Sequence, residues 1–426
     1  MSTAIDEIVE GIVSQRIDKD AAIRSFQGLS GAEKNRLLSK LKSKLTGSAE
    51  KGAAAVSRAL KPIDERSLSE AQREFLAELT ARYGRFAPKS KENASKHSQY
   101  FVDARKAANL RKSIKSLQFH ITYERAEGAY LYDIDGNRYI DITGDNGVNL
   151  FGSQPDFIKD AVAERLSKGY PLVGYTEDLF VAAKLFCEIT DNERMAFTQS
   201  GTEAVMWAVR IARAATQKTK IVIFDSAYHG MSDTVAAVRD HEGNSLAAGL
   251  GIPQEYAEQL IVLDYGDLNQ LNIIEARADE IAGVLVEPIQ ASRPQLQPIE
   301  YLRELRKLTL EKNIPLIFDE MITGFRVCPR GLQGAFKIKA DITTYGKIPG
   351  GGMPTGMIAG SAKYMDFVDG GSWGYEDEFH ARTEENLSRR HAHTQSHQAV
   401  GRPRCLDRDQ KAMSRRSFLR VVRLLP

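Results

Sequence analysis

Short apolar runs, each bounded by polar residues or by glycine or proline, recur through the middle of the chain. Such runs are typical of strands that are buried on both faces of a parallel sheet. We predict strands at residues 194–199, 220–224, 281–288, 315–321 and 342–347. Helical periodicity covers residues 155–187 and 204–215. The alternation of strands with helices predicts an α/β fold with a mainly parallel sheet between helices.

The first part of the chain has helical rather than strand periodicity. A capping signal at 30–33 precedes a helix with one leucine-rich face and one basic face. The basic face suggests either a docking or membrane-surface element or, as we favour, a solvated face of a packed helix. A second capping signal at 69–72 predicts a helix that carries Phe75, Leu76 and Leu79, and residues 89–96 are predicted to be a polar loop.

Alternating apolar and polar residues over 130–141 predict a β-hairpin. Its turn, Asp135-Gly136-Asn137, supplies residues that tolerate positive φ. The glycine-punctuated stretch 144–152 follows, which either lines a substrate site or is a structural connection.

Composition excludes several broad classes. The chain has 426 residues, 42% of them apolar and 27% charged, with a net charge of +2, so it has no global bias toward nucleic acid or membrane surfaces. Its three cysteines form neither a metal-ligand pattern nor a disulfide framework, and we expect no metal. No apolar run is long enough to span a membrane, and the N-terminus does not resemble a signal peptide. We therefore expect a cytoplasmic protein.

Two of the predicted strands end in charged residues that could take part in catalysis. Asp319 follows one apolar run, and Lys347 follows the next and precedes a run of glycines. The carboxyl edge of an open α/β sheet is where ligands bind, so these side chains would meet there. A lysine can form a Schiff base with an aldehyde, and a carboxylate can hold a pyridine nitrogen protonated, as pyridoxal phosphate (PLP) requires. Taken alone, an aspartate at a strand end is usually a helix N-cap or turn former, and most lysines are solvated surface charges, so only the pair and its surroundings favour chemistry at Asp319 and Lys347.

Other strand ends add compatible groups. Ser200, Gly201 and Thr202 lie at a strand-to-helix turn, where backbone N–H groups can bind phosphate, although an ordinary helix cap is the alternative. The next strand leads to Tyr228 and His229, an aromatic pair that either stacks on a planar ring or packs internally. A further strand ends in a carboxylate, Glu287.

Together these motifs resemble the class III, fold type I PLP-dependent aminotransferases. The resemblance rests on SGTEA at 200–204, YHG at 228–230, VEP at 286–288, IFDEMITGFR at 317–326 and GK at 346–347, and it covers residues 119–375. The nearest likenesses are glutamate-1-semialdehyde aminomutases and the aminotransferase domains of polyketide and nonribosomal peptide synthetases. Residues 287–294 and 370–375 are more similar to the synthetase domains.

The resemblance implies a role for each residue. Lys347 would be the Schiff-base lysine and general base, and Asp319 the partner of the pyridinium nitrogen. The resemblance further implies that Ser200, Gly201 and Thr202 hold the phosphate. Tyr228 would stack on one face of the ring with His229 beside it, and Met321 would pack against the other face. Glu287 would lie near the substrate end of the cofactor. We expect Lys347 to have a depressed pKa, as an amine nucleophile needs.

The C-terminal part departs from the family pattern. From residue 380 the chain is arginine-rich and shows little periodicity. The small C-terminal domain of the family is absent or replaced there, and the tail reads like out-of-frame sequence; the alternative is a basic tail that binds an acidic partner. We divide the chain into a helical leader (1–60), a helical segment with a hairpin (61–150), a PLP-binding large domain (151–379) and an aberrant tail, expected to be disordered (380–426).

The function implied is transfer of an amino group from an amino donor to a keto or aldehyde acceptor. If the likeness to synthetase domains holds, the acceptor is a β-ketoacyl chain on a carrier protein. The alternatives are an aminomutase and an inactive remnant that still binds PLP, and we expect weak folding and low activity for the chain as written. Full-length relatives are expected to be homodimers, and we expect neither a nucleic acid nor a membrane partner.

Overall fold

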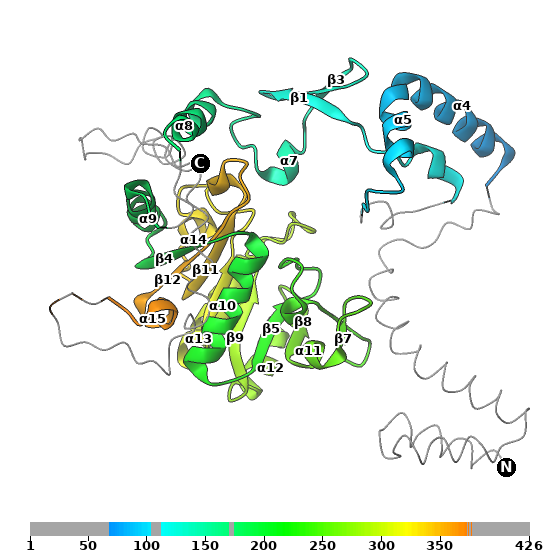
Figure 1. Cartoon of the computed structure of the whole chain (residues 1–426). Helices are drawn as coiled ribbons and strands as arrows, with labels where there is room; N and C mark the ends of the chain where they lie inside the picture. The colour runs from blue at the N-terminus through cyan, green and yellow to red at the C-terminus, as the bar shows by residue number, and fades with distance from the viewer. Residues whose placement is uncertain (1–67, 104–111, 170–173, 373, 375, 377–426) are drawn as a thin grey trace, which may run out of the picture.

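The computed structural model describes residues 68–103, 112–169, 174–372, 374 and 376. The predictions for the leader, 1–60, and for the tail, 380–426, therefore lie outside the described residues. Figure 1 shows a central sheet covered by helices, with the N-terminal helices and hairpin set to one side of it. No helix among the described residues has both the length and the apolar character that a membrane span requires.

The core is a seven-stranded sheet with the order β4-β12-β11-β10-β9-β5-β8. Strands β11, β10, β9, β5 and β8 pair in parallel, whereas β12 runs against both β11 and β4. The sheet is thus mainly parallel, as predicted. Its strands are β4 (Arg194–Thr198), β5 (Lys220–Phe224), β8 (Leu260–Leu263), β9 (Ile281–Val286), β10 (Leu316–Asp319), β11 (Ile342–Gly346) and β12 (Gly356–Gly360).

Successive residues of a central strand enter two different apolar cores. Ile317 packs into one core, while its neighbours Leu316 and Phe318 pack into the other. Side chains alternate across a strand, so a run that is apolar at every position needs a cover on both faces. The helices that cover the two faces are α10 (Gly201–Thr216) and α15 (Ala362–Asp369) on one side and α12 (Leu271–Ala276) and α13 (Ile299–Glu311) on the other.

All five predicted strands are present, with their ends within two residues of the prediction and with β5 matching it at both ends. Two more strands of the sheet, β8 and β12, were not predicted. The four-residue apolar run of β8 has no periodicity that separates a strand from a helix segment. Strand β12 begins and ends with glycine, which lowers its strand propensity, and only its pairing with β11 and β4 fixes it.

The N-terminal region confirms the hairpin and corrects one prediction. Strands β2 (Tyr130–Asp133) and β3 (Arg138–Ile140) pair as expected, with Gly136 at φ 90°, and β1 (Tyr123–Glu127) adds a third strand. Helix α4 (Glu70–Phe86) begins at the predicted capping box. The polar loop predicted at 89–96 is wrong, because helix α5 (Pro88–His97) occupies it.

The capping of α5 explains why its helix was missed. The carboxylate of Asp135, in the hairpin turn, accepts hydrogen bonds from the backbone N–H groups of Lys89 (2.7 Å) and Ser90 (3.0 Å). These two N–H groups lack partners within the helix, so an acceptor from elsewhere in the fold stabilises the helix start. The cap lies some forty-five positions away along the chain, and no local pattern reveals it.

The remaining elements connect these layers. The stretch 144–152 contains one short helical turn and is otherwise a loop. The connecting elements are η3 (Lys112–Leu117), α7 (Gly144–Gly147), α8 (Asp156–Ser167), α9 (Glu177–Thr190), η4 (Asp233–Val235), β6 (Ala237–Arg239), β7 (Ser245–Ala247), α11 (Gln254–Glu258), η5 (Leu268–Gln270), α14 (Gly331–Phe336) and η6 (Ile348–Gly350).

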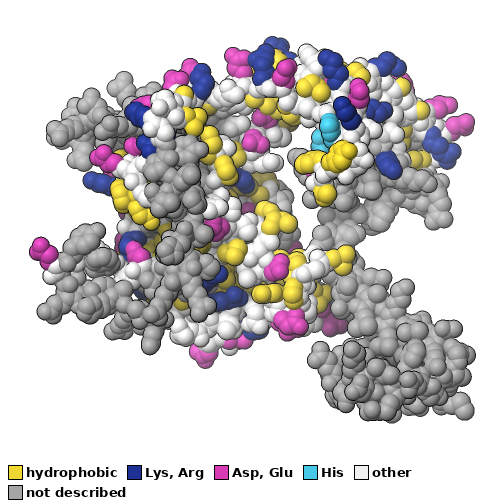
Figure 2. Space-filling model, viewed as in Figure 1, with side chains coloured by type: hydrophobic (Ala, Val, Ile, Leu, Met, Phe, Trp, Pro, Cys, Tyr) yellow, Lys and Arg dark blue, Asp and Glu magenta, His cyan; other side chains and the backbone are white. Residues whose placement is uncertain are grey.

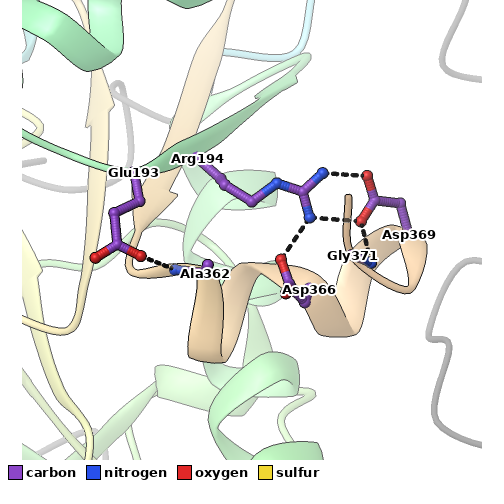
Figure 3. A network of polar contacts seen from close by, with 6 residues as sticks. All are labelled: Glu193, Arg194, Ala362, Asp366, Asp369 and Gly371. Carbon is purple, nitrogen blue, oxygen red and sulfur yellow. Dashed lines mark hydrogen bonds and ion pairs between the residues drawn. The ribbon is translucent and has the colours of Figure 1, made fainter. Parts of the chain in front are cut away.

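Arg194 connects α15 to the edge of the sheet through hydrogen bonds (Figure 3). Arg194, the first residue of β4, donates to Asp369 through two nitrogens, at 2.8 and 2.6 Å, and to Asp366 at 2.5 Å. The preceding residue, Glu193, accepts the N–H of Ala362 at the start of the same helix, at 2.7 Å. A bidentate arginine held in this way is stronger than an ordinary surface ion pair, so α15 is fixed at both ends.

A buried carboxylate, Glu320, organises the segment that follows β10. It accepts hydrogen bonds from the N–H groups of Leu332 (2.7 Å) and Gln333 (3.0 Å) at the start of α14 and from the Thr323 hydroxyl (3.0 Å). Burial raises the pKa of Glu320 to about 7, although these hydrogen bonds act in the opposite direction. A Cβ atom at Gly331, which has φ 64°, would lie 2.1 Å from a carboxylate oxygen of Glu320.

This contact predicts a specific loss of stability for Gly331→Ala. We compare it with Gly128→Ala, whose φ is 55° and whose Cβ would meet no atom within 4 Å. The control should lose only the free energy of unfolding that a left-handed alanine costs, about 1–2 kcal/mol. Gly331→Ala should lose about 1–3 kcal/mol more, because it also displaces a hydrogen-bonded buried carboxylate. Urea unfolding measures both, and equal losses would contradict the role given to Glu320.

Candidate active site

The carboxyl ends of the central strands open into one cavity of about 440 Å³. All nine residues predicted for the site line it, and they come from the ends of five strands or from the turns that follow them. They are Ser200, Gly201, Thr202, Tyr228, His229, Glu287, Asp319, Met321 and Lys347. A cavity of this size is ordinary for a small-molecule site. The structure thus brings the predicted residues together, while the role of each stays a prediction.

The start of α10 forms one end of the cavity. The Ser200 hydroxyl oxygen caps the helix by accepting the Glu203 N–H at 3.2 Å, so the alternative of an ordinary helix cap describes this contact. Capping uses an acceptor lone pair and leaves the hydroxyl proton available as a donor. The first N–H groups of a helix have no partner within it, and together with the helix dipole they favour an anion. Gly201 and Thr202, at the start of the helix, line the cavity.

Met321 lies close to two glycines of different elements, Gly201 and Gly346. A Cβ at Gly201 would lie 2.6 Å from its sulfur, and a Cβ at Gly346 would lie 2.3 Å from it. The thioether therefore contacts both the start of α10 and the end of β11. Only residues without a side chain allow this close approach.

A buried pair lies at the floor of the cavity. His229 Nδ1 is 2.8 Å from Asp319 Oδ2, and both side chains are almost fully buried. Asp319 Oδ1 accepts the Met321 N–H at 3.1 Å and the Thr344 hydroxyl at 3.3 Å. A carboxylate has about four acceptor positions, so Asp319 retains capacity for one more donor. His229 Nε2 is buried and has no hydrogen-bond partner among the described residues.

Glu287 connects two adjacent strand ends. Its carboxylate accepts the Tyr228 N–H at 2.9 Å, which fixes the turn after β5 against the end of β9. Burial raises the pKa of Glu287, and nearby Asp319 adds to the rise, although the Tyr228 hydrogen bond opposes it. The Tyr228 side chain itself is 63% exposed and lines the open side of the cavity. Its ring is therefore free to contact a ligand rather than packed in the core.

Lys347 lies directly after β11, in a backbone conformation with φ 58°. Burial lowers its pKa, as expected for an amine nucleophile, and Arg326 lowers it further. Asp319 and Glu287 act in the opposite direction. Burial by the protein itself is thus the largest cause of the shift.

Several residues in or next to the cavity were not predicted from the sequence. Thr344 lies two positions before the end of β11, beside Asp319 in the parallel register, and nothing in the local sequence marks it. The strand register alone would have found it, because Asp319 pairs with Thr344. The lining residues that were not predicted are Val148, Gln199, Val205, Gly230, Ala291, Ile322, Gly352, Met353, Pro354 and Thr355.

Comparison with known proteins now identifies the family. The family model for class-III aminotransferases matches residues 112–389, which is more than half of the chain. The chain belongs to the class-III aminotransferase family. It resembles a curated glutamate-1-semialdehyde 2,1-aminomutase of Lachnoclostridium phytofermentans, with 39% identity over 58% of this chain and 59% of that protein.

Solved structures agree with this assignment. An omega-transaminase from Sphaerobacter thermophilus is 31% identical with a TM-score of 0.59, covering 66% of this chain and 65% of that one. A transaminase with PLP bound is 30% identical with a TM-score of 0.60, covering 66% of each chain. These neighbours confirm the predicted fold type. The chain spans about three fifths of the length of the curated relative it matches.

The residues of the cavity fit PLP at both of its ends. The start of α10 offers unpaired N–H groups and hydroxyls, which suit a phosphate. At the floor, Asp319 keeps an acceptor position free, which suits a protonated pyridine nitrogen. Lys347 lines the same cavity and supplies an amine with a lowered pKa. The kinds of donor and acceptor groups that line the cavity therefore suit such a cofactor, and the role of each residue stays a prediction.

The lowered pKa of Lys347 predicts how its reactivity depends on pH. A lowered pKa means that the neutral amine is present at a lower pH than in a free lysine, whose pKa is near 10.5. The rate of Lys347 acylation should therefore rise with pH and reach its midpoint below that value. In Asp319→Asn the midpoint should fall further, because the carboxylate that raises the pKa is gone.

Peptide-resolved mass spectrometry after brief acylation over a pH series measures this midpoint. Lys307, exposed on α13, serves as the internal comparison within the same samples. A midpoint for Lys347 above that of free lysine, or an upward shift in Asp319→Asn, would contradict the burial argument.

Proposed function

We propose that this chain carries the PLP-binding domain of a class III aminotransferase, which transfers an amino group to a keto or aldehyde acceptor. The observation that supports it most is the meeting of Lys347, the Asp319–His229 pair and the start of α10 in one cavity. Family membership supports the reaction class. Because the chain spans only part of its relatives' length, the activity of the whole protein remains part of the proposal.

The chemistry divides between the cofactor and the residues of the cavity. Bound PLP supplies an electron sink for the electrons released when a Cα–H bond breaks. The Asp319 carboxylate would retain the proton on the ring nitrogen, and His229 Nδ1, directed at the same carboxylate, would hold it in place. The Lys347 amine would act as the general base that takes the proton from the Cα atom of the amino donor, and as the acid that donates it again later in the reaction.

The remaining residues would orient the cofactor. The N–H groups of Gly201 and Thr202 and the Ser200 hydroxyl would hold the phosphate, since helix starts bind anions. Met321 and the exposed ring of Tyr228 would lie against opposite faces of the pyridine ring, and Glu287 would lie near the substrate end.

The proposal includes two more specific candidate reactions, which differ in their substrate. A β-ketoacyl chain on a carrier protein as acceptor is supported by the likeness of residues 287–294 and 370–375 to synthetase aminotransferase domains. The second candidate, an aminomutase, is supported by the curated relative, which is named for that activity.

Covalent trapping tests cofactor binding. The full chain is incubated with PLP, reduced with borohydride and digested, and the pyridoxyl group is located by mass spectrometry. We expect the label on Lys347 alone at low stoichiometric excess, since this amine is deprotonated more readily than surface lysines. Lys347→Ala should abolish it, while the control Lys307→Ala should leave it unchanged. Labelling that is spread over surface lysines in both variants would contradict the proposal.

Product analysis separates the two substrate readings and the inactive remnant. A transaminase should consume glutamate when a 3-oxoacyl carrier thioester is present. An aminomutase should isomerise glutamate 1-semialdehyde without net consumption of an amino donor. Lys347 labelling without either reaction would indicate a chain that binds PLP but does not catalyse, and the matched control is again Lys347→Ala.

A further inference from the structure

A second cavity adjoins the candidate site and shares part of its wall. It has a volume of about 420 Å³, and Val148, Gly352 and Met353 line both cavities. Ile348, the residue after Lys347, lines only the second one. We call this second cavity the groove. It begins within one residue of Lys347, whose amine the proposed function places at the reacting atoms.

The groove is apolar along its length. It runs between α8 and the 148–155 loop, and its walls are formed largely by Leu150, Phe151, Ile158, Val162, Leu166 and Ile348. Figure 2 shows hydrophobic side chains gathered beside α8 on the face in view. From Ile158 to Leu166 the helix advances roughly 12 Å, so the groove is long as well as apolar.

Most of the polar side chains of the groove have partners among the described residues, and the exception, Gln154, is exposed to solvent. Lys159, the one charged residue among the described lining residues, forms an ion pair with Asp156 at 2.7 Å. Asn149 donates to the Ser153 hydroxyl at 3.3 Å. A ligand in this groove would therefore find few free polar groups, which suits an unsubstituted hydrocarbon and disfavours a charged or hydroxylated one.

Several groove residues leave much apolar surface uncovered. Leu166 is 56% exposed, Met353 is 40% exposed and Leu150 is 36% exposed. Contiguous exposed apolar surface marks a binding groove or an interface, and its continuity with the candidate site favours the substrate over other occupants.

We propose that this groove binds the apolar tail of the amino acceptor, so that the preferred acceptors are oxo compounds with a long aliphatic chain. The proposal rests on the proposed function, since it assumes that the reacting carbonyl lies beside Lys347. The carbonyl end would occupy the first cavity, and the chain would pass Val148 and Met353 to lie along α8.

The affinity of the full chain for unreactive 3-hydroxy acids of increasing length tests the groove without requiring turnover. Calorimetry on the PLP-treated chain should show tighter binding from 3-hydroxybutanoate to 3-hydroxydecanoate, by up to about fourfold for each buried methylene. Leu166→Asp should remove the gain for the longest acid and leave the shortest unaffected. Ser167→Asp, which adds the same charge to the same helix outside the groove, should keep the gain.

A second variant keeps the test valid if Leu166→Asp does not fold. Val162→Phe fills the groove without adding charge, and binding should stop improving at a shorter chain length than in the unchanged protein. Affinity that does not vary with chain length overturns the proposal. If Leu166→Asp also lowers the molecular mass in solution while affinity stays flat, the groove is instead an interface between copies, which equally overturns it.

The two proposals fail separately. Loss of specific Lys347 labelling removes the proposed aminotransferase and leaves the chain-length series as a measurement of the groove alone. Specific labelling with flat affinities retains the cofactor site and rejects only the apolar tail.

Discussion

The candidate site depends on a carboxylate that is kept buried at the end of a central strand. Asp319 ends β10, where parallel neighbours on both sides exclude water, and such a group is stable only if donors surround it. His229, Thr344 and the Met321 backbone provide these donors from three different segments. The carboxylate thereby fixes the relative positions of the turn after β5, the end of β11 and the segment after β10.

The surrounding layers support that arrangement. Strands such as β10 are apolar on both faces and require helices on each side, and the candidate site lies where the strands end. A second carboxylate, Glu320, holds α14 next to the first one, and Glu287 holds the Tyr228 turn. Three adjacent acidic residues of the strand ends thus have different tasks, each determined by the donors around it.

The sequence predicted the five strands with apolar runs and the residues at their ends, because burial and strand-end position leave local traces. It failed where the deciding contact is distant. The start of α5 is capped by Asp135 from the hairpin, and β12 is a strand only because β11 and β4 pair with it. Thr344 was hidden for the same reason: its importance comes from its neighbour across the sheet.

The position of Met321 has a consequence for how this site can vary. Its sulfur lies close to the start of α10 and to the end of β11, so a longer or branched side chain here would press on both elements. Methionine is flexible and polarizable, and it can adjust to small displacements that a branched side chain would resist. One adaptable side chain therefore separates the proposed phosphate site from the strand that leads to Lys347, and an alanine at Gly201 or Gly346 would displace it.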